Sequence, residues 1–492
     1  MVSGGVGYLI PMLINFLATP LLLRKLGDEA FGLQSLVNVI LGYLMVADMG
    51  LDIPITKFLA EYTAKGDISN RDKLLSNTLQ VYGLIGITGL LIIFFAEPYM
   101  YGVFNIPDFL KKEAKIVFWI TGIGFFGNII SMWGKSVFIG IQRYDIANGI
   151  YIGFSLVSTI VGIVMVYNGM GVVYFVLAKV VGFFLSAGSY LIYVKWLLSD
   201  YRFSPGFDKT IFTNIRPLIG YGFLLRFAGM IFGRLDQSLI SAWVGVAAVG
   251  VYSIPFLINT SLTGFISGIM NFTFPKASEL YSTNRTEELK VLFTKSLKYV
   301  SLVSSYFFSF LIAAGDRFIY LWIDERFATE THTTLAILSL AYFINLVSSA
   351  IVNNFVIAMN GMRFFTSYAV IRSVIMAIGF CLLIRPLGIE GAALGVLSAG
   401  VVDIVYLSIS LRKYMDVKFT DIALKSYAKP ILLGMISASV IYYNRPLITD
   451  WLSFLLAGIV YSVLFLILGF AIKVLGEEEK RMIKNVLTRF LR

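Results

Sequence analysis

Apolar segments of roughly 20 residues recur from one end of the sequence to the other, and each is long enough to cross a bilayer as a helix. Only 14% of the 492 residues are charged, whereas soluble domains carry about 25%. The loops between the apolar segments are too short to hold a separate catalytic domain. The sequence therefore predicts an all-α polytopic membrane protein.

We predict about fourteen transmembrane helices, of which the thirteenth is the shortest. They lie near residues 5–23, 31–52, 75–96, 116–134, 146–167, 171–194, 218–241, 249–270, 293–314, 333–357, 364–384, 391–411, 429–443 and 452–474. An even number of spans places both termini on one side of the membrane. The segments on that side hold 27 of the 40 Lys and Arg residues, and the opposite segments hold nine. This bias predicts that both termini are cytoplasmic.

The sequence also repeats itself at an offset of 218 residues. The stretch "LGDEAFGLQS" at 26–35 aligns with "VGVAAVGVYS" at 244–253, and the same offset carries Gly50 onto Gly268 and Glu61 onto Glu279. Six spans separate the two copies, so the repeats are parallel. This pattern predicts two six-helix lobes related by an axis along the membrane normal, with a transport site between them.

The repeat divides the chain into five parts. We expect a first lobe at 1–200, a cytoplasmic linker at 201–217, a second lobe at 218–414, two extra helices at 415–475 and an amphipathic tail at 476–492. The tail carries apolar residues on one face and Lys and Arg on the other. It is expected to lie on the anionic inner leaflet, with packing against the protein's own loops as the alternative.

The seventh span contains three charges in an otherwise apolar stretch: Arg226, Arg234 and Asp236. The first span, its partner in the repeat, has none. A charge at membrane depth is costly unless it faces water, a partner or a cavity. The two arginines are separated by about 12 Å along a helix and about 80° around it, so they can line one wall of a cavity. Asp236, about 160° from Arg234, is expected to face elsewhere. Internal pairing that only holds the lobe together is the alternative for all three.

Three further ionisable residues lie at mid-depth: Lys179, Arg372 and Asp403. Arg372 and Asp403 occupy neighbouring helices of one lobe, and a structural ion pair is the favoured interpretation for them. A role in binding substrate or in coupling stays open for both. Lys179 has no obvious acidic partner in its own lobe, which favours a place in the cavity.

A fourth charged group closes the second span near the cytoplasmic face. In "VADMGLDIPITK", Asp48, Asp52 and Lys57 follow one another within ten residues. They are candidates for a cytoplasmic gate or a coupling-ion site, with Lys57 as a further cavity cation. An ordinary cluster at a helix end is the equally weighted alternative.

The concentration of arginine on the seventh span indicates an anionic substrate, because guanidinium groups stay charged and offer forked donors to diphosphate. Other chemistry is not indicated. The single histidine, His332, has no neighbouring histidine or cysteine to complete a metal site. The sequence lacks a GxxxxGK[ST] phosphate-binding motif, and no basic run with stacking aromatics points to nucleic acid. We expect no cofactor beyond a coupling H⁺ or Na⁺.

Several stretches resemble the polysaccharide transport family of the multidrug/oligosaccharidyl-lipid/polysaccharide (MOP) exporter superfamily. They are "PLLLRKLGDEAFGLQSLVNVILGYLMVADMGLDIPITKFLAEY", "FIGIQRYDIAN", "GRLDQSLISAWVGVAAVGVY" and "RPLGIEGAALG". The resemblance extends over the whole chain and implies a V-shaped fold like that of the MATE transporters. It also implies a flippase that moves undecaprenyl-diphosphate-linked oligosaccharide, such as an O-antigen unit, across the bacterial plasma membrane. The resemblance further implies alternating access and coupling to a cation gradient. The partners that it implies are membrane lipids and polysaccharide assembly proteins.

Three other functions remain as alternatives at this point. A multidrug or cation exporter of the MATE type would need unpaired carboxylates in the cavity. A membrane-embedded glycan polymerase or ligase usually needs a large outer loop, which the sequence lacks. A scaffold without transport activity would not need charged residues between two repeated lobes.

Overall fold

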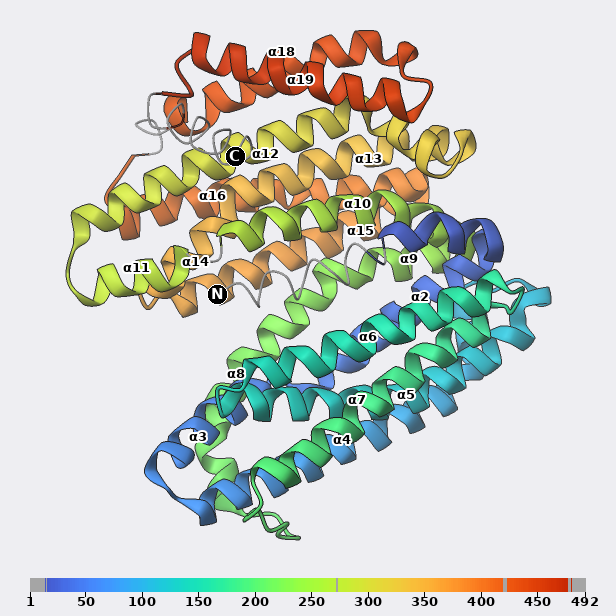
Figure 1. The fold of residues 1–492 in the computed structure, drawn as a ribbon, viewed down its shortest axis with the longest axis vertical. Helices are drawn as coiled ribbons and strands as arrows, with labels where there is room; N and C mark the ends of the chain where they lie inside the picture. Colours follow the sequence, from blue (N-terminus) through green and yellow to red (C-terminus); the bar gives the residue numbers. More distant parts are fainter. Residues whose placement is uncertain (1–13, 15, 271–272, 419–422, 477–478, 480–492) are drawn as a thin grey trace, which may run out of the picture. The chain divides into compact units, whose positions relative to one another are not determined.

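The computed structural model describes residues 14, 16–270, 273–418, 423–476 and 479. These residues form helices joined by short connections, and the described part of the chain contains no β-strand (Figure 1). The chain separates into two compact units. The first holds residues up to Ser253 together with Met376–Ala392, and the second holds Ile254–Ile375 together with the residues from Ala393 onward.

The first unit is built from α-helices and several short helical turns. In chain order they are α2 (Asp28–Leu44), η1 (Met45–Asp48), α3 (Asp52–Lys65), α4 (Ile68–Val103), η2 (Asp108–Leu110), α5 (Lys111–Gly140), α6 (Tyr144–Tyr167), α7 (Val172–Leu197), α8 (Lys209–Met230), η3 (Ile231–Leu235) and α9 (Asp236–Trp243). Of these, α4, α5, α6 and α7 pack side by side (Figure 1).

Close packing in this unit depends on small residues on α5 and its neighbours. Gly86 and Gly89 of α4 lie directly against aromatic side chains of α5, which leaves no room for a Cβ. Small residues at helix interfaces are the usual means of close approach in membranes, where lipid supplies no hydrophobic force between helices. The core contains Trp133, whose indole Nε1–H donates to Thr78 Oγ1 at 3.0 Å. This part of the unit is therefore a rigid bundle that carries α2, α8 and α9.

The second unit contains the remaining helices, with α10 and α15 continuing across the boundary between the units. They are α10 (Val246–Met270), α11 (Thr273–Ser282), α12 (Thr286–Trp322), α13 (Glu325–Asn345), η4 (Leu346–Ala350), α14 (Ile351–Ala358), α15 (Met362–Ser398), α16 (Gly400–Ser410), η5 (Leu411–Met415), η6 (Ala423–Ala428), α18 (Lys429–Asn444), η7 (Arg445–Leu447) and α19 (Trp451–Ala471).

The centre of this unit is α12, which packs against both α13 and α18. Helix α18 packs directly on α12, and α19 is joined to α12 by aromatic contacts (Figure 1). In this cluster the buried Tyr461 donates its hydroxyl to the Tyr306 carbonyl at 2.7 Å. The last two helices are thus part of the second unit's core.

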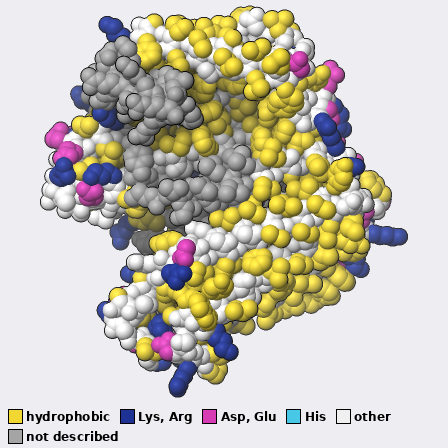
Figure 2. All heavy atoms as spheres, viewed as in Figure 1, with side chains coloured by type: hydrophobic (Ala, Val, Ile, Leu, Met, Phe, Trp, Pro, Cys, Tyr) yellow, Lys and Arg dark blue, Asp and Glu magenta, His cyan; other side chains and the backbone are white. Residues whose placement is uncertain are grey.

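The outer surface is apolar over wide areas, as in a protein surrounded by lipid. Phe95, Ile192, Leu382, Val401 and Leu452 each expose more than 60% of their surface. Figure 2 shows hydrophobic side chains over much of the visible face, with Lys, Arg, Asp and Glu gathered mainly at its margins. Exposed apolar area on this scale is unusual in a soluble monomer and fits contact with acyl chains.

Ten stretches among the described residues are long and apolar enough to cross a membrane, so the membrane class is confirmed and the count of fourteen is not. One of the ten, Met362–Met415, contains two of the predicted spans. They meet where α15 departs from helical geometry at Gly388, with φ 57°. The predicted thirteenth span corresponds to α18, which has only 16 residues. The predicted first span lies largely outside the described residues.

The compact units do not end where the repeat divides the chain. Helices α8 and α9 and the start of α10 belong to the first unit, although the repeat assigns them to a second lobe. Direct backbone packing explains this, because Gly32 of α2 lies against the Val246 carbonyl. The repeat-defined lobes and their V-shaped arrangement stay predictions. The predicted tail at 476–492 lies outside the described residues except for Gly476 and Glu479.

Candidate functional site

A break between α2 and α3 brings two carboxylates close together. Helix α2 ends in the short turn η1, and the next residues, Met49 and Gly50, have φ of 51° and 74°. Glycine adopts this left-handed conformation at no steric cost, whereas few other residues do so. The chain then enters α3 at Asp52. Asp48 therefore ends one helical segment and Asp52 begins the next.

Arg226 of α8 bridges these two carboxylates. Its Nη2 atom lies 2.8 Å from Asp48 Oδ2 and 2.7 Å from Asp52 Oδ1. The Asp48 side chain is fully buried, while those of Arg226 and Asp52 are 27% and 37% exposed. Neither Asp48 oxygen has a well-aligned hydrogen bond in the described part of the chain, so its charge is balanced by proximity to the guanidinium. The sequence predicted all three residues as site candidates but did not predict that they form one cluster.

Arg234 lies about two turns further along, in the π-helical turn η3. Such turns insert one extra residue per turn and occur frequently at functional sites. The half-buried side chain lies against Gly42 of α2, where a Cβ would be 2.8 Å from Arg234 Nε. Its backbone carbonyl accepts the hydroxyls of Ser238 and Tyr43 at 3.2 and 3.4 Å. Within the described residues, its guanidinium has no carboxylate within ion-pair distance.

Asp236 is a buried acid whose two carboxylate oxygens both accept hydrogen bonds. It has no exposed surface, and its Oδ2 accepts the Tyr252 hydroxyl at 2.7 Å. Its Oδ1 accepts the Gln237 backbone N–H at 2.7 Å. Within the described residues Asp236 makes these hydrogen bonds and no ion pair with Arg234, as the helical spacing led us to expect. Its coupling role stays a prediction.

The two lysine candidates lie apart from this cluster. Lys179 of α7 donates to Thr159 Oγ1 of α6 at 2.5 Å, and its ammonium lies 5.7 Å from the Phe175 ring centroid. Lys57 is exposed on α3 and lies 5.2 Å from the ring centroid of Phe58. Neither contact decides whether these lysines line a cavity, so that role stays a prediction.

The predicted pair of Arg372 and Asp403 is present in the second unit. Arg372 Nε lies 2.8 Å from Asp403 Oδ1, and the two side chains are only 8% and 1% exposed. The same carboxylate accepts the Tyr368 hydroxyl at 2.6 Å and the Asn345 amide at 3.2 Å. A buried charge with this many partners is stabilised locally. The geometry therefore favours the structural interpretation of this pair.

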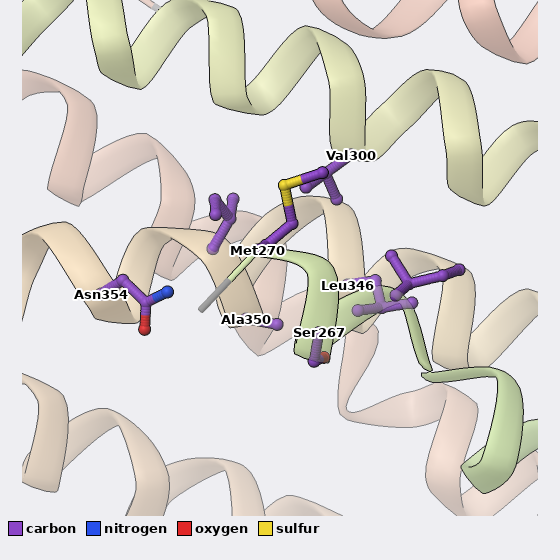
Figure 3. Close-up of a pocket in the computed structure, with 8 residues that line it drawn as sticks. Ser267, Met270, Val300, Leu346, Ala350 and Asn354 are labelled. Carbon is purple, nitrogen blue, oxygen red and sulfur yellow. The ribbon is translucent and has the colours of Figure 1, made fainter. Parts of the chain in front are cut away.

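A small cavity of about 50 Å³ lies in the second unit between α10, α12 and the π-turn η4 (Figure 3). Its lining is mainly apolar, with Ser267 and Asn354 as the polar residues. The Asn354 amide donates to Thr273 Oγ1 at 2.9 Å, so one of its two N–H donors is already used. The described residues contain no group of three side chains suited to a metal ion.

Sequence reasoning missed the hydroxyl groups that complete these clusters. Tyr43, Tyr252 and Tyr368 each touch a charged candidate residue that lies on another helical segment. The buried Tyr82 of α4 is an electrostatic neighbour of Asp48. A chain with 27 tyrosines offers no signal that distinguishes these four, because their roles come only from helix packing.

Comparison with solved structures identifies the fold. The Lipid II flippase MurJ in its inward closed conformation matches with a TM-score of 0.77 at 15% identity, covering 96% of this chain and all of that one. An inward-facing multidrug-resistance MATE transporter of the MOP superfamily matches with a TM-score of 0.67 at 14% identity, covering 88% of this chain and 95% of that one. The molecule is thus a helical membrane protein with the fold of MOP superfamily transporters.

Sequence comparison then identifies the family. The family model described as "Polysaccharide biosynthesis protein" matches residues 2–281, and the chain belongs to this family. A Shigella flexneri protein named "Putative O-antigen transporter" is 21% identical over 69% of this chain and 79% of its own length. The uncharacterized membrane protein EpsK of Bacillus subtilis is 20% identical over 97% of this chain and 95% of its own length. The expected kinship with polysaccharide-transporting members of the MOP superfamily is confirmed.

Proposed function

We propose that this protein is a flippase that moves a polyprenyl-diphosphate-linked oligosaccharide from the inner to the outer leaflet of the bacterial plasma membrane. The family match and the relative named as an O-antigen transporter support this class of substrate. In this proposal the protein works by alternating access, both termini are cytoplasmic, and the polyprenyl tail remains in the lipid.

The observation that carries the proposal is the environment of Arg234. This arginine is half-buried in a span and lacks a carboxylate at ion-pair distance among the described residues. An unpaired charge at that depth is retained only at considerable cost, so a ligand or water is expected to meet it. A diphosphate suits a guanidinium because both partners can form two parallel hydrogen bonds. Arg234 is therefore assigned the first contact with the diphosphate.

Arg226 gives the proposal a route to ion coupling. In its present position the guanidinium neutralises the buried Asp48 and the partly exposed Asp52. A diphosphate that recruits Arg226 would leave the Asp48 carboxylate buried without a partner, which is strongly unfavourable. Uptake of H⁺ or Na⁺ by Asp48 would relieve this cost. Substrate and coupling ion would thus be linked, because a ligand shifts the protein only toward a state that it binds better.

A MATE-like exporter of cations is the second candidate. It is supported by Asp236, a fully buried carboxylate that forms no ion pair among the described residues. In that case the buried acids would bind the substrate directly, and Arg234 would be dispensable. A flippase should therefore lose activity when the charge of Arg234 is removed, whereas an exporter should lose activity when the charge of Asp236 is removed.

Native mass spectrometry of the protein purified gently from its own host membranes is the first test. A bound polyprenyl-diphosphate glycan is the expected result and would also reveal the sugar composition. Phospholipid alone, combined with tight binding of hydrophobic cations added afterwards, would favour the exporter and overturn the proposal.

A matched set of variants provides the second test. Arg234→Gln is expected to reduce export of glycan in cells by at least tenfold without loss of expression, because a charged hydrogen-bonding partner of the substrate is removed. Arg143→Gln is the control, since this exposed arginine pairs with Asp145 at a cytoplasmic helix start. Full export by Arg234→Gln would refute the assignment of the diphosphate contact.

A further inference from the structure

A second cavity, of about 270 Å³, lies in the second unit far along the chain from the residues assigned above. It opens to the surface and is lined by the end of α12, the first turns of α13 and the short helix η7 that joins α18 to α19. The lining residues are Asp316, Arg317, Tyr320, Glu325, Ala328, Thr329, His332 and Arg445. This polar pocket is thus formed by segments that the Lys and Arg distribution assigns to the outer side of the membrane.

The charges in the polar pocket are loosely paired. Asp316 Oδ2 lies 3.9 Å from Arg317 Nε and 3.8 Å from Arg445 Nη1. Hydrogen bonds between such groups are about 2.7–2.9 Å long, so neither contact is a hydrogen bond. Asp316 therefore offsets only one of the two positive charges and does not occupy the guanidinium donors.

Several polar atoms facing this cluster are shielded from water and lack partners. Asp316 Oδ1, Arg317 Nε and Arg445 Nη1 are each buried and make no hydrogen bond within the described residues. A buried polar atom without a partner is costly, so clusters of such atoms need an explanation. Three of them around one cavity indicate a ligand with both negative and hydrogen-bonding groups.

Arg445 is held in place by an aromatic ring. Its guanidinium carbon lies 4.3 Å from the ring centroid of Tyr442, which is a favourable cation–π distance. Stacking leaves the edge of the guanidinium plane free for hydrogen bonds. A positioned guanidinium loses less freedom when it binds a ligand, which favours recognition of a planar anion such as a carboxylate.

We propose that the polar pocket binds one acidic sugar residue, with its carboxylate on Arg317 and Arg445. The remaining polar lining, Glu325 and Thr329 together with Asp316, can accept or donate hydrogen bonds to sugar hydroxyls. The volume lies just below the roughly 300–1,000 Å³ of pockets for drug-sized molecules, which fits a single saccharide unit. The origin of the sugar, a glycan that has crossed the membrane, rests on the proposed function. The pocket would then hold an acidic residue of the glycan on the exit side.

Direct binding of free sugars tests this inference without any transport step. The full-length protein in phosphatidylcholine nanodiscs is titrated with D-glucuronate or D-glucose, and binding is followed by saturation-transfer NMR. Inorganic phosphate has no carbon-bound proton to observe, so its binding is measured by competition with bound glucuronate. Glucuronate is expected to bind at least tenfold more tightly than glucose or phosphate. Arg317→Gln and Arg445→Gln are each expected to weaken glucuronate binding about tenfold or more, because a charged hydrogen bond is lost.

Two controls separate loss of the pocket from loss of the fold. Arg285→Gln removes an exposed arginine of the same unit, which pairs with Glu288 at 2.6 Å, and should leave binding unchanged. Thr329→Val changes the lining without changing its charge and should weaken glucuronate binding while the protein remains folded.

Three results would overturn the inference. They are equal binding of glucose and glucuronate, tighter binding of phosphate than of glucuronate, and displacement of glucuronate by phosphatidylglycerol added to the nanodiscs. Tighter binding of phosphate would assign the pocket to a free phosphate, and displacement by phosphatidylglycerol would assign it to a lipid headgroup. If glucuronate binds as expected but Arg234→Gln exports glycan normally, the proposed function fails and the pocket assignment stands. If that variant is inactive but glucuronate does not bind, the pocket assignment alone fails.

Discussion

The cluster of Asp48, Asp52 and Arg226 gives the sharpest prediction, because its two carboxylates differ in burial. Arg226→Gln removes the cation that lies 2.8 Å from a fully buried carboxylate. Breaking a buried pair from one side costs about 3–5 kcal/mol. The partial exposure of Arg226 places the expected loss in the free energy of unfolding near the lower limit, about 3 kcal/mol.

The neutral replacement of Asp48 should be milder. In Asp48→Asn the Arg226 guanidinium still has Asp52 as a partner at 2.7 Å, and that pair is partly exposed. We therefore expect the free energy of unfolding to fall by only about 1 kcal/mol. The double variant Arg226→Gln/Asp48→Asn removes both charges and should lose about 2 kcal/mol. These values correspond to a coupling energy of about 2 kcal/mol between Arg226 and Asp48. The same cycle with Asp52→Asn should give only about 0–1 kcal/mol.

Equilibrium unfolding in mixed micelles by sodium dodecyl sulfate measures these differences. The single cysteine, Cys381, is exposed and belongs to the first unit, so a fluorophore attached there reports on the unit that holds the cluster. A coupling energy below about 0.5 kcal/mol for the Asp48 cycle would refute the reasoning, because separate sites add within that margin. A coupling energy for Asp52 equal to that for Asp48 would show that burial does not set the strength of the pair.

Three further predictions concern the rest of the molecule. Gly42→Val should lower glycan export without loss of folding, because a side chain at position 42 displaces Arg234. The measurement is the rate of glycan export per folded molecule. Asp403→Ala should cost about 3–5 kcal/mol of unfolding free energy, because it removes the carboxylate that lies 2.8 Å from the buried Arg372; the sodium dodecyl sulfate titration measures this loss as well. Burial raises the pKa of Glu479, but hydrogen bonds from Lys298 and a backbone N–H outweigh it and hold the pKa at about 2. The ionised Glu479 carboxylate therefore stabilises the fold fully above its unfolded pKa of about 4.3, and this stabilisation is lost as the pH falls toward 2. In Lys298→Met the pKa of Glu479 should rise, so that this stabilisation is already lost near pH 4. Hydrogen exchange at residues 473–476 can detect the change.

Each of these predictions has a control or a contradicting result. Gly188 of α7 has open space where a Cβ would lie, so Gly188→Val should leave export unchanged. Reduced export per folded molecule in Asp403→Ala would show that this pair acts in transport as well as in stability. Equal protection at pH 4 in the Lys298→Met variant and the parent protein would show that Lys298 does not set the pKa of Glu479.

Much of the site could be anticipated from charge alone. Charged residues within apolar spans are few, and each must find a partner or a ligand, so Arg226, Arg234 and Asp236 stand out without any structure. The pairing of Arg372 with Asp403 followed from opposite charges on neighbouring helices, and the structure contains it. The number of spans was less predictable, although the short thirteenth span already stood out in the sequence and corresponds to the 16-residue α18.

The sequence by itself determined the membrane class, the positions of most spans and the candidate charges. It did so because apolar length and the cost of buried charge are local properties of the chain. Only the tertiary structure decided which candidates meet. The break at Gly50 turns Asp48 and Asp52 toward Arg226, and the glycine at position 42 makes room for Arg234. The pocket around Asp316 likewise joins segments more than 100 residues apart, from α12 to η7. Such contacts depend on helix packing between distant segments, which no single stretch of sequence encodes.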